Sequence, residues 1–239
     1  MLNSSIIKKI KTNYGVSGKE ALSITLLNRG GYANANVYKV DVEGAEFRCL
    51  TVKDFSQCNI LTKYFIAPFL IRRERYYLTL LKDILQVDAG CVKALSPYVI
   101  AFPYIKGRSL AQLKKNDERI GDDFFLKLEK LVKALHQQSV VHLDIRNLGN
   151  IIYSDKEPFL IDFQSAVSTR LMPRFFRKLL EESDLSGVYK GWRKCGINPL
   201  PEEKEQKLRR LNKIRKFWVF RKKALRNRLP KSWRNTDKV

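Results

Sequence analysis

Apolar and polar residues alternate along the first part of the chain, as they do in half-buried strands. Over residues 21–55 the alternation is interrupted at Gly30-Gly31 and again at Glu43-Gly44. Alternating segments that are separated by glycine-containing turns predict a meander of antiparallel hairpins.

One helix is predicted after these strands. Pro68 suits the first turn of a helix, and apolar residues then recur on one face at Leu70, Tyr77 and Leu81. The same face carries a single acid, Glu74. An apolar strand follows within "YVIAFPYIKGRSL", whose proline and glycine predict a connection between two lobes.

The second half of the chain is predicted to be mainly helical. Asp122 or Asp123 can cap a helix whose apolar residues between 125 and 135 recur at steps of three and four. The short segments "NIIY" and "PFLIDF" then predict two small strands that form a hairpin around residues 154–156.

Two further helices complete the predicted α+β fold. One starts near Met172, and the last starts at Pro201 with two acids in its first turn, where they favour the helix dipole. The patterns divide the chain into a strand-rich lobe over residues 1–102, a small helical lobe over residues 103–200 and a helical tail over residues 201–239.

Composition narrows the class of protein. A chain of 239 residues with 44% hydrophobic residues can bury a core in one domain or two small lobes. No apolar run reaches the length of a transmembrane helix, and the start lacks the apolar stretch of a secretory signal. The four cysteines include no C-x-x-C pair and predict neither a zinc site nor a disulfide framework. These features favour a folded protein of the reducing cytoplasm.

Positive charge is concentrated in the tail. The formal net charge is +22, and the residues from 204 onward contain fifteen lysines or arginines against two acids. Apolar residues such as Leu211, Ile214 and Trp218 fall among them at helical spacing. Such a basic amphipathic helix can lie on an anionic membrane surface, bind RNA, pack against the second lobe or simply remain solvated.

Oxygen-bearing side chains stand at the ends of the predicted hairpin strands. "VVHLDIRNLGNIIYSDKEPFLIDFQ" contains Asp144 and Asp162 in apolar surroundings, with Asn147 and Asn150 between them. Mg²⁺ prefers oxygen ligands from one or two carboxylates together with phosphate and water. The constellation therefore predicts a divalent-cation site suited to a nucleotide, whereas one such aspartate alone would more simply cap a turn.

This segment also resembles a known superfamily. "HLDIRNLGN" is similar to the catalytic loop of the protein-kinase-like superfamily, and "LIDFQ" resembles its metal-binding D-F-G segment. The resemblance implies that Asp144 orients or deprotonates the acceptor hydroxyl and that Asp162 and Asn150 hold Mg²⁺. It further implies that Arg146 steadies the transferred phosphate and that His142 is a buried structural residue.

The first half of the chain supplies the other parts of the resemblance. "NRGGYANANVYKV" resembles the glycine-rich loop that covers nucleotide phosphates. Lys53 lies in an apolar strand, where an unpaired ammonium is costly, and Glu74 is its natural counter-ion. "IAFPYIKGRSL" resembles the hinge that binds adenine. Over about residues 25–166 the resemblance implies these nucleotide-binding residues: Gly30, Gly31, Lys53, Glu74, Phe102 and Tyr104.

Some positions depart from the protein-kinase pattern. Asn150 follows Asp144 by six residues instead of five, so Asn147 is an alternative metal ligand, although Asn150 is favoured because it directly precedes a strand. Gln164 replaces the glycine of D-F-G. No A-P-E segment follows Asp162, and little room is left for a full peptide-binding lobe. This minimal layout resembles the bacterial lipopolysaccharide-core sugar kinases and the RIO-type atypical kinases.

The sequence therefore predicts a kinase that uses ATP and Mg²⁺ to phosphorylate a hydroxyl. The first expectation is a sugar of a lipid-linked glycan such as lipopolysaccharide core, at the inner face of the cytoplasmic membrane. An alternative is a RIO-like serine/threonine protein kinase or ATPase associated with RNA or ribosomes. A pseudokinase scaffold that binds nucleotide without turnover is the third possibility.

Overall fold

An antiparallel sheet forms the N-terminal lobe of the computed structural model, which describes residues 2–16, 22–30, 34–42 and 49–213. Its five strands lie in the order β1-β2-β3-β5-β4. Their bounds are β1 Leu22–Asn28, β2 Asn36–Val42, β3 Cys49–Asp54, β4 Lys93–Ser96 and β5 Val99–Pro103. The predicted meander is confirmed, because β1 pairs with β2 and β2 with β3. The turn residues Gly31, Glu43 and Gly44 lie outside the described residues.

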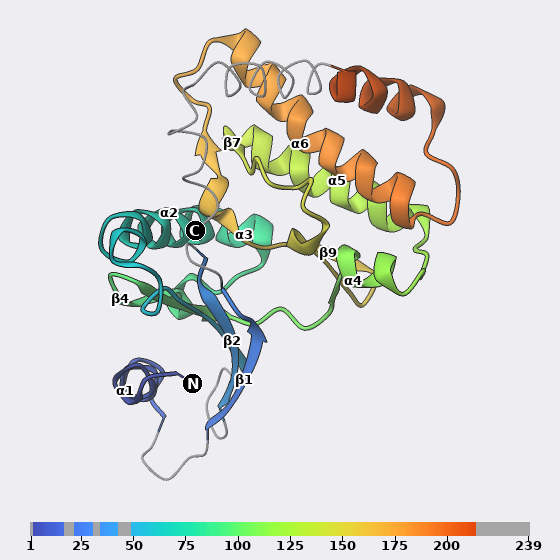
Figure 1. The fold of residues 1–239 in the computed structure, drawn as a ribbon. Coiled ribbons are helices and arrows are strands. Elements are labelled where there is room, and N and C mark those ends of the chain that lie inside the picture. The colour runs from blue at the N-terminus through green and yellow to red at the C-terminus, as the bar shows by residue number, and fades with distance from the viewer. Residues whose placement is uncertain (1, 17–21, 31–33, 43–48, 214–239) are drawn as a thin grey trace, which may run out of the picture.

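The predicted helix crosses this sheet on the side of the second lobe (Figure 1). It consists of a π-helical turn over Thr62–Ile66 and helix α2 over Ala67–Leu80. Its buried face includes Ile71, Glu74 and Tyr77, as expected. The short elements α3 (Lys82–Leu85) and η2 (Ala89–Cys91) lead from it to β4.

The helix at the start of the chain was not predicted, and neither was the short helix α4 (Leu110–Lys115). Helix α1, Ser4–Asn13, lies beside β4 and buries Ile6 and Ile10 in a small core of the N-terminal lobe. Asn3 caps it through a hydrogen bond from the Ser5 N–H to the Asn3 side chain, of 3.0 Å. Its few apolar residues stand among lysines and give only a weak helical pattern.

The second lobe is built from helices around two small sheets (Figure 1). Strands β6, β8 and β9 form one sheet, and β7 and β10 form the other. A final helix starts at residue 202 and is described as far as residue 213. The remaining bounds are β6 Arg108–Ser109, α4 Leu110–Lys115, α5 Asp122–Gln137, β7 Val140–Val141, η3 Leu148–Asn150, β8 Ile151–Ser154, β9 Glu157–Leu160, η4 Phe163–Ser165, β10 Val167–Ser168 and α6 Arg174–Cys195.

Two helix starts differ from prediction. The N-cap of α5 is Gly121, and Asp122 and Asp123 lie in the first turn instead. Asp122 is used differently, because its carboxylate accepts a 3.1 Å hydrogen bond from the indole of Trp192. The helix expected from Met172 begins at Arg174 after Pro173 and continues to Cys195.

The β8–β9 hairpin is confirmed and sets the geometry of the site. Asp155 and Lys156 have positive φ angles of 48° and 66°, as a tight turn between antiparallel strands requires. Beyond the paired strands, the Ile161 N–H donates to the Asn150 carbonyl at 3.0 Å. This bond brings Asn150 next to the segment that carries Asp162. None of the helices in the described ranges combines the length and apolar character needed to cross a bilayer.

Candidate active site

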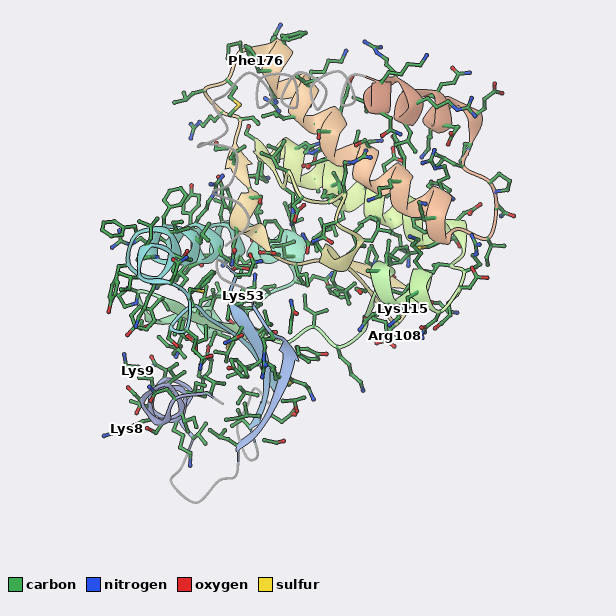
Figure 2. The ribbon with its side chains drawn as sticks, in the orientation of Figure 1. Lys8, Lys9, Lys53, Arg108, Lys115 and Phe176 are labelled. Carbon is green, nitrogen blue, oxygen red and sulfur yellow. The ribbon has the colours of Figure 1, made fainter. Side chains whose placement is uncertain are left out.

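A buried lysine joins the two lobes. Lys53 on β3 donates to the Glu74 carboxylate on α2 at 2.6 Å and to the Asp162 carboxylate at 2.9 Å. It lies where the N-terminal sheet meets α2 (Figure 2). The expected pairing of Lys53 with Glu74 is thereby confirmed as a contact. A buried cation is tolerated here because it has two carboxylate partners.

The three charged groups shift one another's pKa. Burial works against the charged form of Lys53, but Glu74 and Asp162 outweigh it and raise the pKa of the ammonium. Burial raises the pKa of the fully buried Glu74 above its ordinary value despite Lys53. Burial also acts to raise the pKa of Asp162, yet the charge and hydrogen bond of Lys53 hold it below the ordinary range. Asp162 is therefore the more firmly ionised carboxylate of the pair.

Two side chains tie α2 to the segment after Asp162. The amide of Gln164 donates to the second Glu74 oxygen at 3.0 Å. Arg73 donates through Nε to the Ala166 carbonyl at 2.6 Å, with a longer contact to the Ser165 carbonyl. Gln164, which takes the place of the D-F-G glycine, thus completes the hydrogen bonding of a buried acid.

Asp184 on α6 binds the backbone of the loop that leads to Asp144. Its buried carboxylate accepts hydrogen bonds from the backbone N–H groups of His142, at 2.7 Å, and Leu143, at 2.8 Å. Leu143 has a φ of 65°, an unfavourable angle for a branched residue that these bonds stabilise. The loop is therefore held in one conformation just before Asp144.

His142 is buried under the loop, as expected. Its Nε2 lies 3.1 Å from the Ile161 carbonyl, and its Nδ1 accepts from the Asp144 N–H at 3.3 Å. These two partners fit a neutral imidazole with its proton on Nε2. The ring also packs on Phe163 at 4.6 Å. Burial lowers the pKa of His142 below its ordinary value.

Asn150 contacts the aspartate of the loop. Its amide nitrogen donates to the Asp144 carboxylate at 2.8 Å and to the Asp144 carbonyl at 3.1 Å. Asn147 instead caps the η3 turn, where its side-chain oxygen accepts from the Gly149 N–H at 3.1 Å. The Asn150 oxygen also accepts a hydrogen bond, from the Asn147 amide at 3.4 Å, and both side chains belong to the lining of one cavity. Asn150 differs from Asn147 in its direct contact with the Asp144 carboxylate.

The structure does not bring Arg146 into the cleft. Its guanidinium donates to the Ser186 hydroxyl at 2.7 Å and to the Asn212 side chain at 3.0 Å. Lys190 also donates to the Arg146 carbonyl at 2.6 Å. Arg146 therefore joins the loop to α6 and to the final helix, and a role on the transferred phosphate would need a different rotamer.

A cavity of about 570 Å³ opens between the lobes and reaches Lys53, Asn150 and Asp162. Phe102 and Tyr104, which the resemblance assigns to nucleotide binding, are among the residues that line it. The Tyr104 N–H donates to the Cys49 carbonyl at 3.0 Å and is therefore engaged within the first lobe. The apolar residues that line the cavity are Leu27, Val37, Phe102, Pro103, Ile105, Ile152 and Ile161.

Gly30 lies beside a neighbouring polar cavity, not in this one. A Cβ at residue 30 would stand 1.9 Å from the Asn34 carbonyl oxygen. Glycine is therefore required by a close approach within the β1–β2 connection. Gly31 lies outside the described residues.

The donor set fits an Mg²⁺ ion that is bound with phosphate. Within the described residues no group of three His, Cys, Asp or Glu side chains forms a closed metal site. Asp162 and Asn150 nevertheless face one cavity, and the Asp162 side chain is 36% exposed. One carboxylate and one amide oxygen leave most positions to phosphate oxygens and water, as Mg²⁺ usually requires.

The sequence interpretation missed Asp184 and Asn212. On α6 the buried positions Asp184, Val188, Trp192 and Cys195 recur at steps of four and three. This periodicity could have identified Asp184 as an inward-facing acid, but the helix was predicted only as far as that residue.

Comparison with known families identifies the fold. The model of the RIO domain matches residues 51–206, more than half of the chain. The chain belongs to the RIO domain family. The matched range includes Lys53, Glu74, Asp144 and Asp162, whereas Gly30 precedes it. No curated protein sequence is significantly similar to the chain.

Solved structures of a RIO kinase have the same fold. The Rio2 kinase from Chaetomium thermophilum superposes with a TM-score of 0.55 at 14% identity, and its ADP/Mg²⁺-phosphoaspartate complex with 0.56 at 14% identity. These matches cover 84% and 85% of this chain, but only 66% and 64% of the Rio2 chains. The chain thus spans less than two thirds of those matched chains, and at this identity the likeness shows the fold alone. The predicted α+β kinase-like fold is confirmed.

Proposed function

We propose that this RIO-family protein transfers the γ-phosphate of ATP to a hydroxyl group, with Mg²⁺ as cofactor. The supporting observation is the Lys53 ammonium between Glu74 and Asp162 at the rim of a cavity that also contains Asn150. When bound, Mg²⁺ would neutralise phosphate charge in the transition state. The Rio2 complex with ADP and Mg²⁺ supports the same cofactor pair.

Each residue of the site has a distinct proposed role. Lys53 would contact the α and β phosphates, and Glu74 would keep it in place. Asp162 and Asn150 would hold the metal ion. Asp144 would orient the acceptor hydroxyl and take its proton, because its carboxylate is half-buried and is positioned by Asn150.

Two substitutions test this division of roles. Asp162→Ala should abolish the Mg²⁺-dependent component of ATP binding measured by calorimetry. Asp144→Asn should leave ATP affinity nearly unchanged and lower transfer by about 10²-fold or more. Asp155→Ala, in the exposed hairpin turn, is the control. Equal loss of binding and transfer in Asp144→Asn would contradict the role given to Asp144.

The acceptor is proposed from the sequence that follows the metal-binding segment. After Asp162 the described chain contains η4, β10, α6 and the final helix, and it has no A-P-E segment of the kind found in peptide-phosphorylating kinases. This supports a small or lipid-linked acceptor such as a glycan sugar, whereas membership of the RIO family supports a serine/threonine or ribonucleoprotein substrate. Radiolabelled ATP incubated separately with membrane glycolipid and with a ribosomal fraction distinguishes the two by the labelled product.

ATP hydrolysis is a second candidate function, and the phosphoaspartate of the Rio2 complex supports it. A carboxylate oxygen of Asp162 would attack the γ-phosphorus, the bond from that phosphorus to the β–γ bridging oxygen would break, and ADP would leave. Water would then attack the acyl phosphate, releasing inorganic phosphate and the carboxylate. After reaction with ATP labelled in its γ-phosphate and an acid quench, the wild-type protein should carry a phosphate label that hydroxylamine removes. The Asp162→Asn protein should carry none. An unlabelled wild-type protein would exclude this route.

A further inference from the structure

Helix α2 and the π-helical turn before it are apolar on both sides. The inner side buries Thr62, Ala67, Ile71 and Glu74. A helix on a protein surface normally turns charged and polar residues to the outside. Here the outer side repeats large apolar residues at steps of four and seven, which are one and two helical turns, with these exposed fractions: Leu61 64%, Phe65 72%, Phe69 60%, Tyr76 58% and Leu80 47%.

This outer stripe, defined as Leu61, Phe65, Phe69, Tyr76 and Leu80, borders a shallow apolar groove. The groove has a volume of about 480 Å³ and runs between Phe69, Tyr76 and the β10 residue Val167. After β10 the chain again exposes large apolar side chains at Leu171, Phe175 and Phe176. Figure 2 shows that Phe176 lies at the start of α6, away from α2, so these three residues are not part of the outer stripe. An exposed apolar stripe with an adjoining groove, such as the one on α2, normally marks a binding site.

The exposed charges beside the outer stripe are positive. Between residues 60 and 80 the single acid is Glu74, which is fully buried against Lys53. Arg72 and Arg75 are exposed, and Arg73 lies over the Phe69 ring at 5.5 Å. The surface therefore combines aromatic and aliphatic side chains with arginines, a combination suited to the interface of an anionic bilayer.

We propose that the outer stripe of α2 is a docking surface for an anionic lipid bilayer. Phe65, Phe69 and Leu61 would enter the boundary between headgroups and acyl chains, and Arg72 and Arg75 would contact lipid phosphates. This inference goes beyond phosphotransfer and does not depend on it. It concerns the described residues of the first lobe, separately from any membrane contact of the tail.

Other occupants fit the charge and chemistry less well. A second copy of the chain would oppose Arg72 and Arg75 to their own equivalents in a protein that already carries +22. Residues 214–239 of the same chain contain ten lysines or arginines against one acid, so they would also meet like charge. Nucleic acid would satisfy the arginines and the aromatic rings but would leave Leu61 and Leu80 without apolar partners.

Docking on this side would leave the active site accessible. The outer stripe faces away from Glu74 and Lys53, which occupy the opposite side of the same helix. Gln164 and Arg73 connect α2 to the segment that follows Asp162. A bilayer on the outer stripe would therefore contact the helix that positions Lys53, without covering the cavity.

Vesicle binding by the full-length chain tests the proposal. Sucrose-loaded vesicles of phosphatidylcholine and phosphatidylglycerol, at roughly 3:1, should sediment the wild-type protein, and pure phosphatidylcholine vesicles should sediment much less. Phe65→Glu/Phe69→Glu should weaken binding to the mixed vesicles by about tenfold or more. Arg72→Gln/Arg75→Gln should weaken it by a smaller factor that shrinks in high salt.

Matched controls keep the result specific. Leu126→Glu on α5 and Ile197→Glu after α6 place the same charge at other exposed apolar residues and should leave binding unchanged. Thermal unfolding should show that all variants are folded. Equal binding of wild type and Phe65→Glu/Phe69→Glu would overturn the proposal, as would a wild type that does not bind. If transfer RNA bound instead and binding required Phe65 and Phe69, the surface would be a nucleic-acid site and the bilayer proposal would be wrong.

Discussion

Two buried acids stabilise the two sides of the site by different means. Glu74 in α2 is paired with the Lys53 ammonium and accepts a hydrogen bond from the Gln164 amide. Asp184 in α6 is surrounded by backbone N–H groups of His142 and Leu143, with the His136 ring 3.3 Å away. Glu74 therefore depends on the protonation and position of a flexible side chain, whereas Asp184 depends on backbone atoms of a fixed loop.

The site therefore has two sides that differ in kind. The charges of Lys53, Glu74 and Asp162 form a coupled side, and Asp184 with the loop it binds forms a rigid side. A charge network across the lobes can respond to nucleotide, because phosphate oxygens would compete with Asp162 and Glu74 for Lys53. The Asp184 bonds have no equivalent competitor in the cleft and set the backbone before Asp144 regardless of ligand. Substitutions should consequently affect stability most at Asp184 and affect nucleotide-dependent behaviour most at Lys53.

The largest expected effect is that of Asp184→Ala. Two backbone N–H groups would lose their acceptor in a buried position, so the free energy of unfolding should fall by about 3–5 kcal/mol. Urea unfolding followed by circular dichroism measures this loss. Glu181→Ala, three residues earlier on α6 and only partly buried, should cost less than about 1 kcal/mol. Similar losses in the two variants would show that Asp184 does not anchor the loop.

Lys53→Met should have a smaller effect on stability and a larger one on the reaction. Burial already raises the pKa of Glu74, so that acid can take up a proton when its partner is lost, and unfolding should become easier by about 1–3 kcal/mol. Phosphate transfer should fall by about 10²-fold or more, because Lys53 is proposed to contact the phosphates.

Glu74→Gln is the partner experiment to Lys53→Met. It keeps the shape of the side chain and removes a buried charge, so stability should change by less than about 1 kcal/mol while transfer falls. A strong destabilisation by Glu74→Gln would mean that the charge of Glu74, and not its shape, holds α2 in place. That outcome would make the coupled side as rigid as the Asp184 side.

The sequence predicted the coupled side better than the rigid one. Lys53 in an apolar strand and Glu74 on the face of a helix stand out as charges in apolar surroundings, and their pairing could be inferred. Asp184 lies in "EESDLSG", where neighbouring polar residues give it the pattern of a solvated turn. Its burial follows from the packing of α6 against α5, a tertiary contact that local periodicity expresses only over the full length of α6.

The role of Arg146 could not be predicted for a related reason. Motif order placed it two residues after Asp144, but its partners Ser186 and Asn212 lie 40 and 66 residues further along the chain. The direction of a long side chain is set by such distant partners. Helix α1 was missed because its burial against β4 contributes more to its stability than its short apolar pattern.

Gln164→Ala tests the link between the two sides. The variant would remove one hydrogen bond to the buried Glu74, with an expected loss of about 1–1.5 kcal/mol. Gln164→Glu should cost more, because it would place a second carboxylate beside Glu74. The ratio of the two losses, measured by thermal unfolding, reports how strongly the segment after Asp162 is tied to α2. Equal stability of wild type and Gln164→Ala would show that the Gln164 hydrogen bond does not contribute to this link.

The smallest predicted effect is the pH response of His142, where burial and nearby carboxylates compete. Burial favours the neutral ring, whereas the charges of Asp184, Asp162 and Asp144 favour the protonated one, and burial is the larger effect. Because the folded-state pKa is lowered, the unfolded chain binds more protons below about pH 6.5. The stability that depends on neutral His142 is therefore complete above that pH and is lost as pH falls through it, by less than about 1 kcal/mol at pH 6.

The chain has two histidines, so proton NMR with His136→Asn assigns the His142 resonance. A titration midpoint below 6.5 is expected for His142. A midpoint above 6.5 would mean that the carboxylates outweigh burial, and the loop anchored by Asp184 would then be as dependent on charge as the Lys53 network.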